Sequence, residues 1–434
     1  MSTDQIETRP RRVAIPQPEP GLTPDELVKR AAAIRPLLRS QQDESDKRGY
    51  YSREAHEAML KAGLYRVCQP KMWGGYEFDF STLLRCSIEI SRGQPGAGWC
   101  YTLASSHVIV ASSYLSPQAQ AEIFTGDGDF RAPHKAVPSG KADKVDGGYM
   151  VNGTWTYSSG IPYATHAFAS TTVADPNGGP PKWGHFIVPR DKVTMLDDWG
   201  GDHSLGMQAS GSNGIRIDNV FVPDRFFFFD DMLFSSKADG SGTYGTELHG
   251  NPMYIAVVGG IYHSTFGAIM TGTARAALDE YEELMRKRAV PNTPNLRLMD
   301  PESQRIIGKA IQLTDSAEAL TIACGDRYKE QCERWARDKK QITTEETLRL
   351  WGMAQEACFM ANEATEMLFK TAGSSPTNPG QKMGRYFRDI QMYITHPSSQ
   401  TRIPLMIAQN YLGLTNAPSL FASRGRTEGG PTKE

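Results

Sequence analysis

Several common signatures are absent from this chain of 434 residues. No apolar run reaches the roughly 18 residues of a membrane span, and the polar, Pro-rich segment 1–21 lacks the apolar core of a signal peptide. The formal net charge of -2 argues against nucleic acid as the main partner. Its cysteines are too scattered for a disulfide framework or a CxxC metal site: Cys68, Cys86, Cys100, Cys324, Cys332 and Cys358. We therefore expect a cytoplasmic protein with reduced, mostly buried thiols.

The nucleotide-binding motifs are missing as well. The chain has no GxGxxG after a predicted strand and no GxxxxGK[ST], so neither a dinucleotide-binding fold nor a P-loop is supported. We therefore expect that the chain does not use NAD(P)H itself. The spacing of its nine histidines fits no metal site, and we expect no metal.

The first part of the chain has helical patterns. Thr23 precedes Pro24 and is followed three positions later by Glu26, an arrangement that predicts a helix over 24–40. Ser52 can cap a second helix that ends near Gly63, and a third is expected over 117–124. We expect a disordered tail over 1–22 and an N-terminal helical domain over 23–130.

The pattern then changes to short β-rich runs between turn residues. Segments 149–152, 186–189 and 215–223 predict strands, so we expect a central β-domain over 131–235. Helical spacing returns later in the chain, where Thr343 and Glu346 form a capping-box pattern. About four long helices are expected in a C-terminal bundle over 236–412, followed by a tail over 413–434.

Several motifs occur in one order along nearly the whole chain. They are Ala62-Gly63-Leu64-Tyr65, Thr154-Trp155-Thr156-Tyr157-Ser158-Ser159-Gly160, the loop 205–213 (LGMQASGSN), Gly384-Arg385-Tyr386-Phe387-Arg388-Asp389 and Thr395-His396-Pro397-Ser398. Together they resemble the acyl-CoA dehydrogenase superfamily. The resemblance implies an α+β fold: an N-terminal helical domain, a central β-barrel or sandwich domain, and a C-terminal four-helix bundle.

One departure from the dehydrogenases concerns the catalytic base. In those enzymes a glutamate follows the Arg-Asp pair and removes the α-proton of an acyl thioester. Here the next carboxylate after Asp389 is Glu428, and 248–278 contain no Asp or Glu either. His396 stands at or next to the vacant position. The chain therefore resembles more closely the two-component flavin-dependent monooxygenases (group D) of this superfamily, which include the oxygenase components of aromatic hydroxylases.

The resemblance also implies a flavin site. The serine-rich form of the 154–160 motif is typical of the hydroxylases and lies beside the flavin ring, with Ser159 next to flavin N5. In the dehydrogenases an Arg-x-x-Phe-Gly motif reaches the cofactor of a neighbouring subunit, and here only Arg286 and Arg288 remain near that place. The cofactor-binding residues expected are Trp155, Tyr157, Ser158, Ser159, Ser210, Gly211, Ser212, Arg286, Arg288 and Thr395.

Three residues are expected to carry the chemistry. A C4a-hydroperoxyflavin loses H2O2 unless water is excluded and its N5 proton is held by a hydrogen bond, a role that fits the hydroxyl of Ser159. Oxygen transfer to a phenol-like ring is assisted by a group that accepts the phenol proton, and histidine suits this near neutral pH. By resemblance, His107 faces the substrate and His396 lies on the other side. The remaining seven histidines are interpreted as packing residues.

The expected function is that of an oxygenase component that uses FMNH2 or FADH2 and O2 to hydroxylate a small aromatic substrate. A separate flavin reductase would supply the reduced flavin, and the fold implies a homotetramer. Three alternatives stay open: an acyl-CoA dehydrogenase with an unrecognised base, an oxygenase that acts on nitrogen or sulfur, and a non-catalytic flavin-binding homologue.

Overall fold

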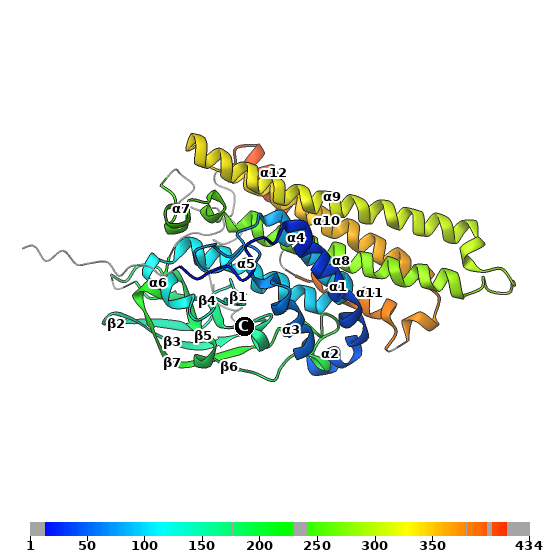
Figure 1. The fold of residues 1–434 in the computed structure, drawn as a ribbon, viewed down its shortest axis with the longest axis horizontal. Coiled ribbons are helices and arrows are strands. Elements are labelled where there is room, and N and C mark those ends of the chain that lie inside the picture. Colours follow the sequence, from blue (N-terminus) through cyan, green and yellow to red (C-terminus); the bar gives the residue numbers. More distant parts are fainter. Residues whose placement is uncertain (1–13, 176, 230–240, 379, 397–401, 415–434) are drawn as a thin grey trace, which may run out of the picture.

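A computed structural model describes residues 14–175, 177–229, 241–378, 380–396 and 402–414. The chain runs from a helical region through one curled sheet into a second helical region, and the two helical regions pack against each other above the sheet (Figure 1). This arrangement confirms the predicted α+β class. Within the described residues, no helix is both long enough and apolar enough to cross a bilayer.

The N-terminal helices begin where local capping predicts. Helix α1 (Pro24–Ser40) is capped by Thr23, whose hydroxyl accepts a hydrogen bond from the backbone N–H of Glu26. After α2 (Gln42–Arg48), the Ser52 hydroxyl caps α3 (Arg53–Lys61) in the same way. The last helix of this region is α6 (Pro117–Ile123).

Two further N-terminal helices form the centre of the molecule. Helix α4 (Phe80–Gly93) leads directly into α5 (Pro95–Tyr114), and all but one of the residues of α5 are buried. Close approach of α4 and α5 requires glycine at position 98, because a Cβ atom there would lie 2.0 Å from Ser91 Oγ. Helix α5 packs against both α4 and the C-terminal region, so its side chains can face the sheet and the bundle at once.

The β-domain is one sheet with strand order β6-β7-β3-β2-β4-β5-β8, and β1 pairs in parallel with β4. The antiparallel pair of β3 with β7 has an irregular register between Val151 and Gly153. Its core contains Trp155 and Phe186. The strands are β1 (His134–Lys135), β2 (Lys141–Val145), β3 (Gly148–Trp155), β4 (His166–Val173), β5 (Lys182–Pro189), β6 (Thr194–Met195), β7 (Ile215–Pro223) and β8 (Phe227–Phe228).

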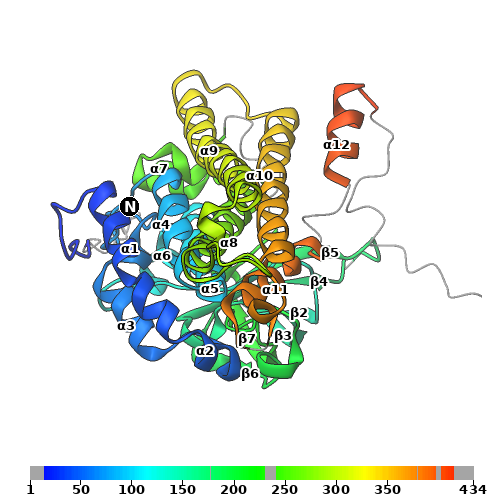
Figure 2. The ribbon, with the colours of Figure 1, turned by 90° about the vertical axis from the view of Figure 1, so that its right-hand side faces the viewer.

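The C-terminal region has three long helices where about four were predicted. After the short α7 (Tyr244–His249) come α8 (Val258–Lys287), α9 (Pro301–Asp338) and α10 (Thr344–Thr371), which pack side by side (Figure 2). The predicted capping box at Thr343 and Glu346 is present. The fourth helix, α11 (Lys382–Ile394), has only 13 residues, and α12 (Arg402–Tyr411) packs on α10.

Part of the predicted N-terminal tail lies within the described residues. Residues 1–13 lie outside the described part of the chain, as do 415–434 of the predicted C-terminal tail. Ile15, however, donates a backbone hydrogen bond to the carbonyl of Met72, and the Gln17 amide donates to the carbonyl of Gly75. Within the range predicted as a tail, these two contacts join the segment from Ile15 onward to the turn after α3.

Candidate functional site

The predicted flavin-binding elements meet between the β-domain and the C-terminal helices. The loop 205–213 rests on α11, where the Asp389 carboxylate accepts a hydrogen bond of 2.6 Å from the backbone N–H of Met207. Glycine is required at position 206, since a Cβ atom there would lie 2.2 Å from the carbonyl oxygen of Arg388. The loop is thereby held against α11, and His396 follows two residues after the end of this helix.

Ser159 lies in a chain of side-chain hydrogen bonds. The Trp99 indole of α5 donates to Ser159 Oγ over 3.0 Å, and Ser159 Oγ is 2.7 Å from Ser212 Oγ. Ser212 Oγ is in turn 2.6 Å from Ser210 Oγ. The Ser159 hydroxyl is thus bound by side chains from other elements and does not bond to its own turn. Three of the predicted serines share one network, which holds their hydroxyl oxygens in place.

The adjacent residues are consistent with a planar bound group. Tyr157 is 60% exposed although its backbone is in the left-handed region (φ 59°), which is unfavourable for a bulky residue. Its ring contacts Trp199 and lies 5.2 Å from Lys135 Nζ. Ser158 Oγ is buried, and among the described residues it has no hydrogen-bond partner. Tyr157, an exposed ring on a strained backbone, lies next to the unsatisfied hydroxyl of Ser158. These two side chains fit an isoalloxazine ring, which offers a flat face to the aromatic ring and polar edge atoms to the hydroxyl.

Three other residues predicted to bind the cofactor, Trp155, Gly211 and Thr395, differ in their burial and in their contacts. The Trp155 ring is fully buried in the β-domain core and donates to the carbonyl of Ser170 over 2.8 Å, which leaves only its backbone for a flavin contact. Gly211 has a positive φ of 53° and lies between the two networked serines. Thr395 is exposed at the end of α11, where its hydroxyl donates to the carbonyl of Met392.

The two predicted arginines lie far from Ser159 of the same chain. Arg286 is near the end of α8, 20 residues after Phe266, which corresponds to roughly 30 Å along the helix. Its guanidinium pairs with Glu282 on the surface, and Arg288 follows the helix end. Neither residue can contact a flavin phosphate next to Ser159 in its own subunit.

His396 is placed beside the serine network. Its ring packs against Phe266 of α8 at 4.8 Å and edge-on to Trp99 at 5.9 Å. Burial, and to a smaller extent the positive charge of Lys135, lower the pKa of His396 to about 4. At neutral pH it is therefore an uncharged imidazole. It can accept a hydrogen bond, or a proton for a short time during the reaction, but it is not protonated at rest.

Helices α5 and α8 face each other beyond this point. Trp99, Leu103 and His107 follow one another at intervals of four residues on α5, and Tyr262 and Phe266 do so on α8. His107 is 2% exposed, and its Nδ1 lies 2.7 Å from the carbonyl oxygen of Ala132. Because a carbonyl only accepts, Nδ1 carries the proton and Nε2 is the acceptor. Burial lowers the pKa of His107 to about 4, so this ring is also neutral at pH 7.

The Arg-Asp motif of α11 has a structural role. Arg385 binds Asp46 and Asp43 of α2, with a distance of 2.7 Å from Nε to the Asp46 carboxylate. Asp389 is buried, and desolvation followed by the nearby charge of Asp46 raises its pKa to about 7. The motif therefore joins α11 to α2 through the arginine and to the 205–213 loop through the aspartate.

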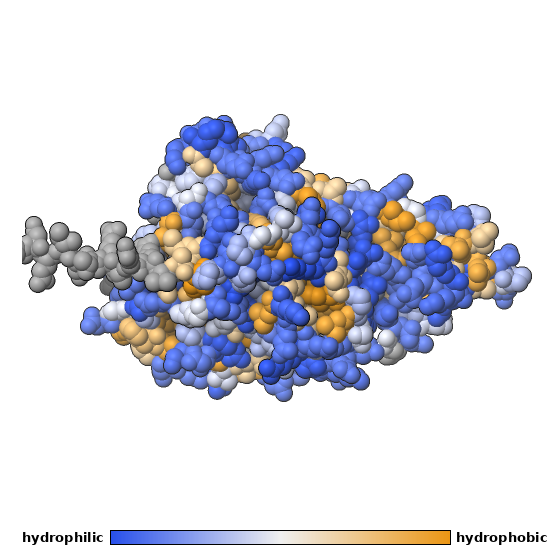
Figure 3. Space-filling view, in the orientation of Figure 1, coloured by the Kyte–Doolittle hydropathy of each residue, from blue (hydrophilic) through white to orange (hydrophobic). Residues whose placement is uncertain are grey.

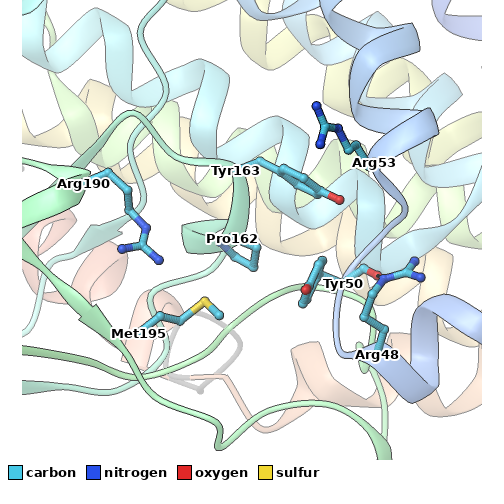
Figure 4. A pocket seen from close by; sticks show the side chains of 7 residues that line it. All are labelled: Arg48, Tyr50, Arg53, Pro162, Tyr163, Arg190 and Met195. Atoms are coloured by element: carbon cyan, nitrogen blue, oxygen red, sulfur yellow. Dashed lines mark hydrogen bonds between the residues drawn. The ribbon is translucent and has the colours of Figure 1, made fainter.

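A cavity of about 370 Å³ is lined by residues that include Tyr50, whose backbone pairs with that of Ser210. It has two aromatic walls, and three guanidinium groups surround it (Figure 4). Arg190 donates to the carbonyl groups of Ile161 and Val193, and Arg48 donates to that of Tyr50. None of the predicted catalytic residues lines this cavity, so it is separate from the serine network.

Some residues of the site were missed or underestimated from sequence. Trp99, Phe266, Tyr262 and Lys135 received no role, and His134 was interpreted as a packing residue. For Trp99, Tyr262 and Phe266 the signal was the four-residue spacing on α5 and α8, which is hard to detect because α5 is buried on nearly every face. His134 and Lys135 lie on β1, and no local pattern marks them. Among the described residues, no group of three or more His, Cys, Asp or Glu side chains is arranged to hold a metal.

Comparison with known proteins agrees with this geometry. Residues 30–123 match the family model for the acyl-CoA dehydrogenase N-terminal domain, and residues 264–401 match a model of its C-terminal domain. The chain belongs to the acyl-CoA dehydrogenase superfamily. The two models cover α5, α11 and α8 from residue 264 onward, the helices that surround the serine network.

Similar proteins include oxygenases. The oxygenase component of p-hydroxyphenylacetate 3-hydroxylase from Acinetobacter baumannii is 26% identical over 381 residues, which is 86% of each chain. The crystal structure of 3-HSA hydroxylase from Rhodococcus sp. RHA1 matches with a TM-score of 0.79 and 26% identity, covering 89% of this chain and 97% of that one. XiaF from Streptomyces sp., solved with FADH2 and glycerol, matches with a TM-score of 0.81 and 21% identity, covering 92% and 98%.

Proposed function

We propose that this protein is the oxygenase component of a two-component flavin-dependent monooxygenase, which adds one oxygen atom of O2 to a small phenol-like substrate. One observation carries the proposal: Ser159 lies in a network with Trp99, beside the neutral His396, where the dehydrogenases place their glutamate. This arrangement provides hydrogen-bond donors and acceptors, and it lacks the carboxylate that dehydrogenation requires.

Reduced flavin supplies the electrons that activate O2 when it is bound. The residues of this chain then have three tasks. Ser159 holds a proton at the flavin edge by a hydrogen bond, and the network fixes its orientation. The rings of Trp99 and Phe266 exclude water from the same place. His396 accepts a hydrogen bond at the site of oxygen transfer without carrying a charge.

The substrate is expected between α5 and α8. The Nε2 acceptor of His107 suits the hydroxyl group of a phenol, and Trp99, Leu103 and Phe266 supply apolar contacts for an aromatic ring. The names of the similar oxygenases favour substrates of this class. We further propose a separate flavin reductase as partner, a homotetrameric assembly and a cytoplasmic location.

The requirement for a reductase is our first prediction. The purified chain with NADH and FMN or FAD should form no product from phenols, because it has no expected nicotinamide site. Addition of a flavin reductase should restore product formation, measured by chromatography together with NADH consumption. The screen should include indoles and thiophenes. Products from these compounds alone would favour the alternative of an oxygenase that acts on nitrogen or sulfur. Rapid NADH oxidation by the chain alone would contradict the two-component proposal.

The alternative that this chain is an acyl-CoA dehydrogenase can be tested with the same preparation. Bound oxidised flavin should keep its visible absorbance when acyl-CoA is added without O2 or a reductase. Bleaching under these conditions would select the dehydrogenase. Tight retention of flavin with no oxygen-dependent turnover would instead indicate a non-catalytic homologue.

A further inference from the structure

Three polar rings lie together where α5, α8 and β1 meet. The ring centroids of His107, His134 and Tyr262 are 5.4 Å, 5.2 Å and 5.6 Å apart, so each ring contacts the other two. His107 is 2% exposed, whereas His134 and Tyr262 are only partly buried. Of the three, the two residues without an assigned role are thus more open to a ligand than His107.

Tyr262 and His134 form a close pair. The Tyr262 hydroxyl lies 2.6 Å from His134 Nδ1, and the pair joins α8 to strand β1. The His134 ring is stacked on Phe168 with centroids 3.7 Å apart and an interplanar angle of 10°. His134 Nε2 is 3.5 Å from Ser170 Oγ, which in turn lies 2.8 Å from His185 Nδ1. The imidazole is therefore held on its face and on both nitrogens.

The protonation states leave the Tyr262 hydroxyl available to a ligand. Burial lowers the pKa of His134 and raises that of Tyr262, so both are neutral near pH 7. If His134 Nδ1 carries the proton, it donates to Tyr262, whose own proton can be given to a ligand. If the proton is on Nε2, Tyr262 donates to Nδ1, and its oxygen can accept from a ligand hydroxyl. The pair can meet either a phenolate or a phenol.

The position of Tyr262 suits recognition of a single aromatic ring. It precedes Phe266 by four residues on α8, and side chains at this spacing are about 5–6 Å apart. Phe266 contacts His396, beside the serine network. A ring with its hydroxyl at Tyr262 would therefore present its opposite edge toward Phe266 and His396, where oxygen transfer is proposed.

We propose that Tyr262 binds the hydroxyl group of the substrate together with His107, whose ring it contacts, and that His134 is the positioning residue that orients the Tyr262 hydroxyl. This inference rests on the proposed function, because it assumes that an aromatic ring lies between α5 and α8. It deepens that function by naming a residue, Tyr262, that recognises the free hydroxyl group of the substrate.

The test measures binding in the absence of reductase. The full-length chain, with and without oxidised FMN, is titrated with 4-nitrophenol and with its methyl ether, 4-nitroanisole, and Kd is obtained from the change in protein fluorescence. Tyr262→Phe keeps the ring and removes one hydroxyl. It should weaken binding of 4-nitrophenol about 5- to 20-fold, since one hydrogen bond in a desolvated site is lost. The Kd of 4-nitroanisole should stay nearly unchanged.

Tyr114→Phe is the matched control. Tyr114 lies on α5, and its hydroxyl donates to the carbonyl of Ala256 over 3.1 Å in the interior. Its removal should leave the ratio of the two Kd values unchanged. His134→Phe keeps the stack on Phe168 and should reduce the preference for 4-nitrophenol, and His134→Gln, which retains hydrogen-bonding groups, should restore part of it.

Two outcomes would overturn the role of Tyr262: an unchanged Kd for 4-nitrophenol in the Phe variant, or an equal loss for both ligands in a variant whose circular dichroism is that of the wild type. These outcomes are independent of oxygenase activity. A chain that never oxygenates would contradict the proposed function and leave this binding result standing.

Discussion

The imidazole of His396 is the side chain that most separates this site from that of a dehydrogenase. Its packing against Phe266 and Trp99 keeps it neutral, so it acts through a lone pair and not through a charge. Ser159 complements it, because its hydroxyl is oriented by Trp99 and Ser212. At the scale of single residues, the chemistry depends on where protons are held.

His396→Ala should uncouple the reaction. We expect the rate of coupled turnover to fall about 10²-fold, the usual size of a general acid-base contribution, and more H2O2 to be released per NADH consumed. Product and H2O2 are measured together with the reductase present. His249→Ala is a control, since His249 lies at the end of α7 and binds Gln120. An unchanged product yield in a folded His396 variant would return this residue to a packing role.

Ser159→Ala should also raise H2O2 release, by loss of the hydroxyl that Trp99 and Ser212 orient. The affinity for reduced flavin should change only a few-fold, because one hydrogen bond contributes about 1 kcal/mol. Ser87→Ala, which removes a buried hydroxyl bound to its own helix α4, is the matched control. The role of Ser159 is wrong if the variant produces no more H2O2 than this control.

At the scale of elements, the short helix α11 determines the geometry of the site. Arg385 fastens it to α2, and Asp389 fastens it to the 205–213 loop. Its C-terminal end carries Thr395 and His396 to the serine network. The position of His396 relative to Ser159 therefore depends on contacts between three elements that are far apart in the sequence.

Asp389→Asn should change how stability depends on pH. The folded-state pKa of Asp389 is raised from 3.8 to about 7. Between these values the unfolded chain is ionised while the folded chain keeps its proton, so the stability of the wild type falls as pH rises. Relative to the Asn variant, the free energy of unfolding of the wild type should fall by up to about 4 kcal/mol between pH 3.8 and pH 7. Above pH 7 the difference between the two proteins should stay nearly constant.

Urea unfolding at intervals from pH 4 to pH 8 measures this difference. Asp143→Asn, on an exposed position of β2, is the control that should follow the wild type. A constant difference between wild type and Asp389→Asn over the whole range would show that Asp389 ionises normally in the folded protein.

At the scale of the whole molecule, the chain is expected to complete its flavin site with a second copy. Arg286 and Arg288 lie at the far end of α8 from Phe266 and cannot reach the flavin of their own subunit. Hydrophobic residues are visible on the surface of the bundle (Figure 3), and Met299, Leu405 and Tyr411 are more than half exposed. Such exposed apolar side chains are typical of surfaces that associate.

We predict a homotetramer by light scattering. Replacement of Arg286 and Arg288 by Ala should weaken binding of reduced flavin about tenfold or more, the cost of losing a charge-assisted contact, and leave the assembly intact. Lys370→Ala, which removes a surface partner of Glu366 on α10, is the control. Hybrid assemblies of the Ser159→Ala chain with the double arginine variant should recover part of the coupled activity. In some of their sites an intact Ser159 from one chain meets intact Arg286 and Arg288 from the other. A fully active monomer would contradict this arrangement.

The ends of helices were predictable because they depend on neighbouring residues. Thr23 and Thr343 cap helices because each hydroxyl group accepts a hydrogen bond from the backbone N–H three positions later. Helix α5 was less visible, because it is buried on nearly every face and has little amphipathic pattern. The parallel pairing of β1 with β4 joins His134 to Phe168, and no local pattern indicates such a pairing.

The amino-acid sequence by itself determined the α+β class, the caps, the serine-rich motif and the lack of a glutamate after Asp389. These features depend on composition and on neighbours within a few positions. Only the tertiary structure decided which atoms meet: Ser159 with Trp99, His107 with the carbonyl of Ala132, and Tyr262 with His134, which is 128 residues away. Protonation states follow from these distant contacts and from burial, so the chemistry of the site is a property of the folded chain.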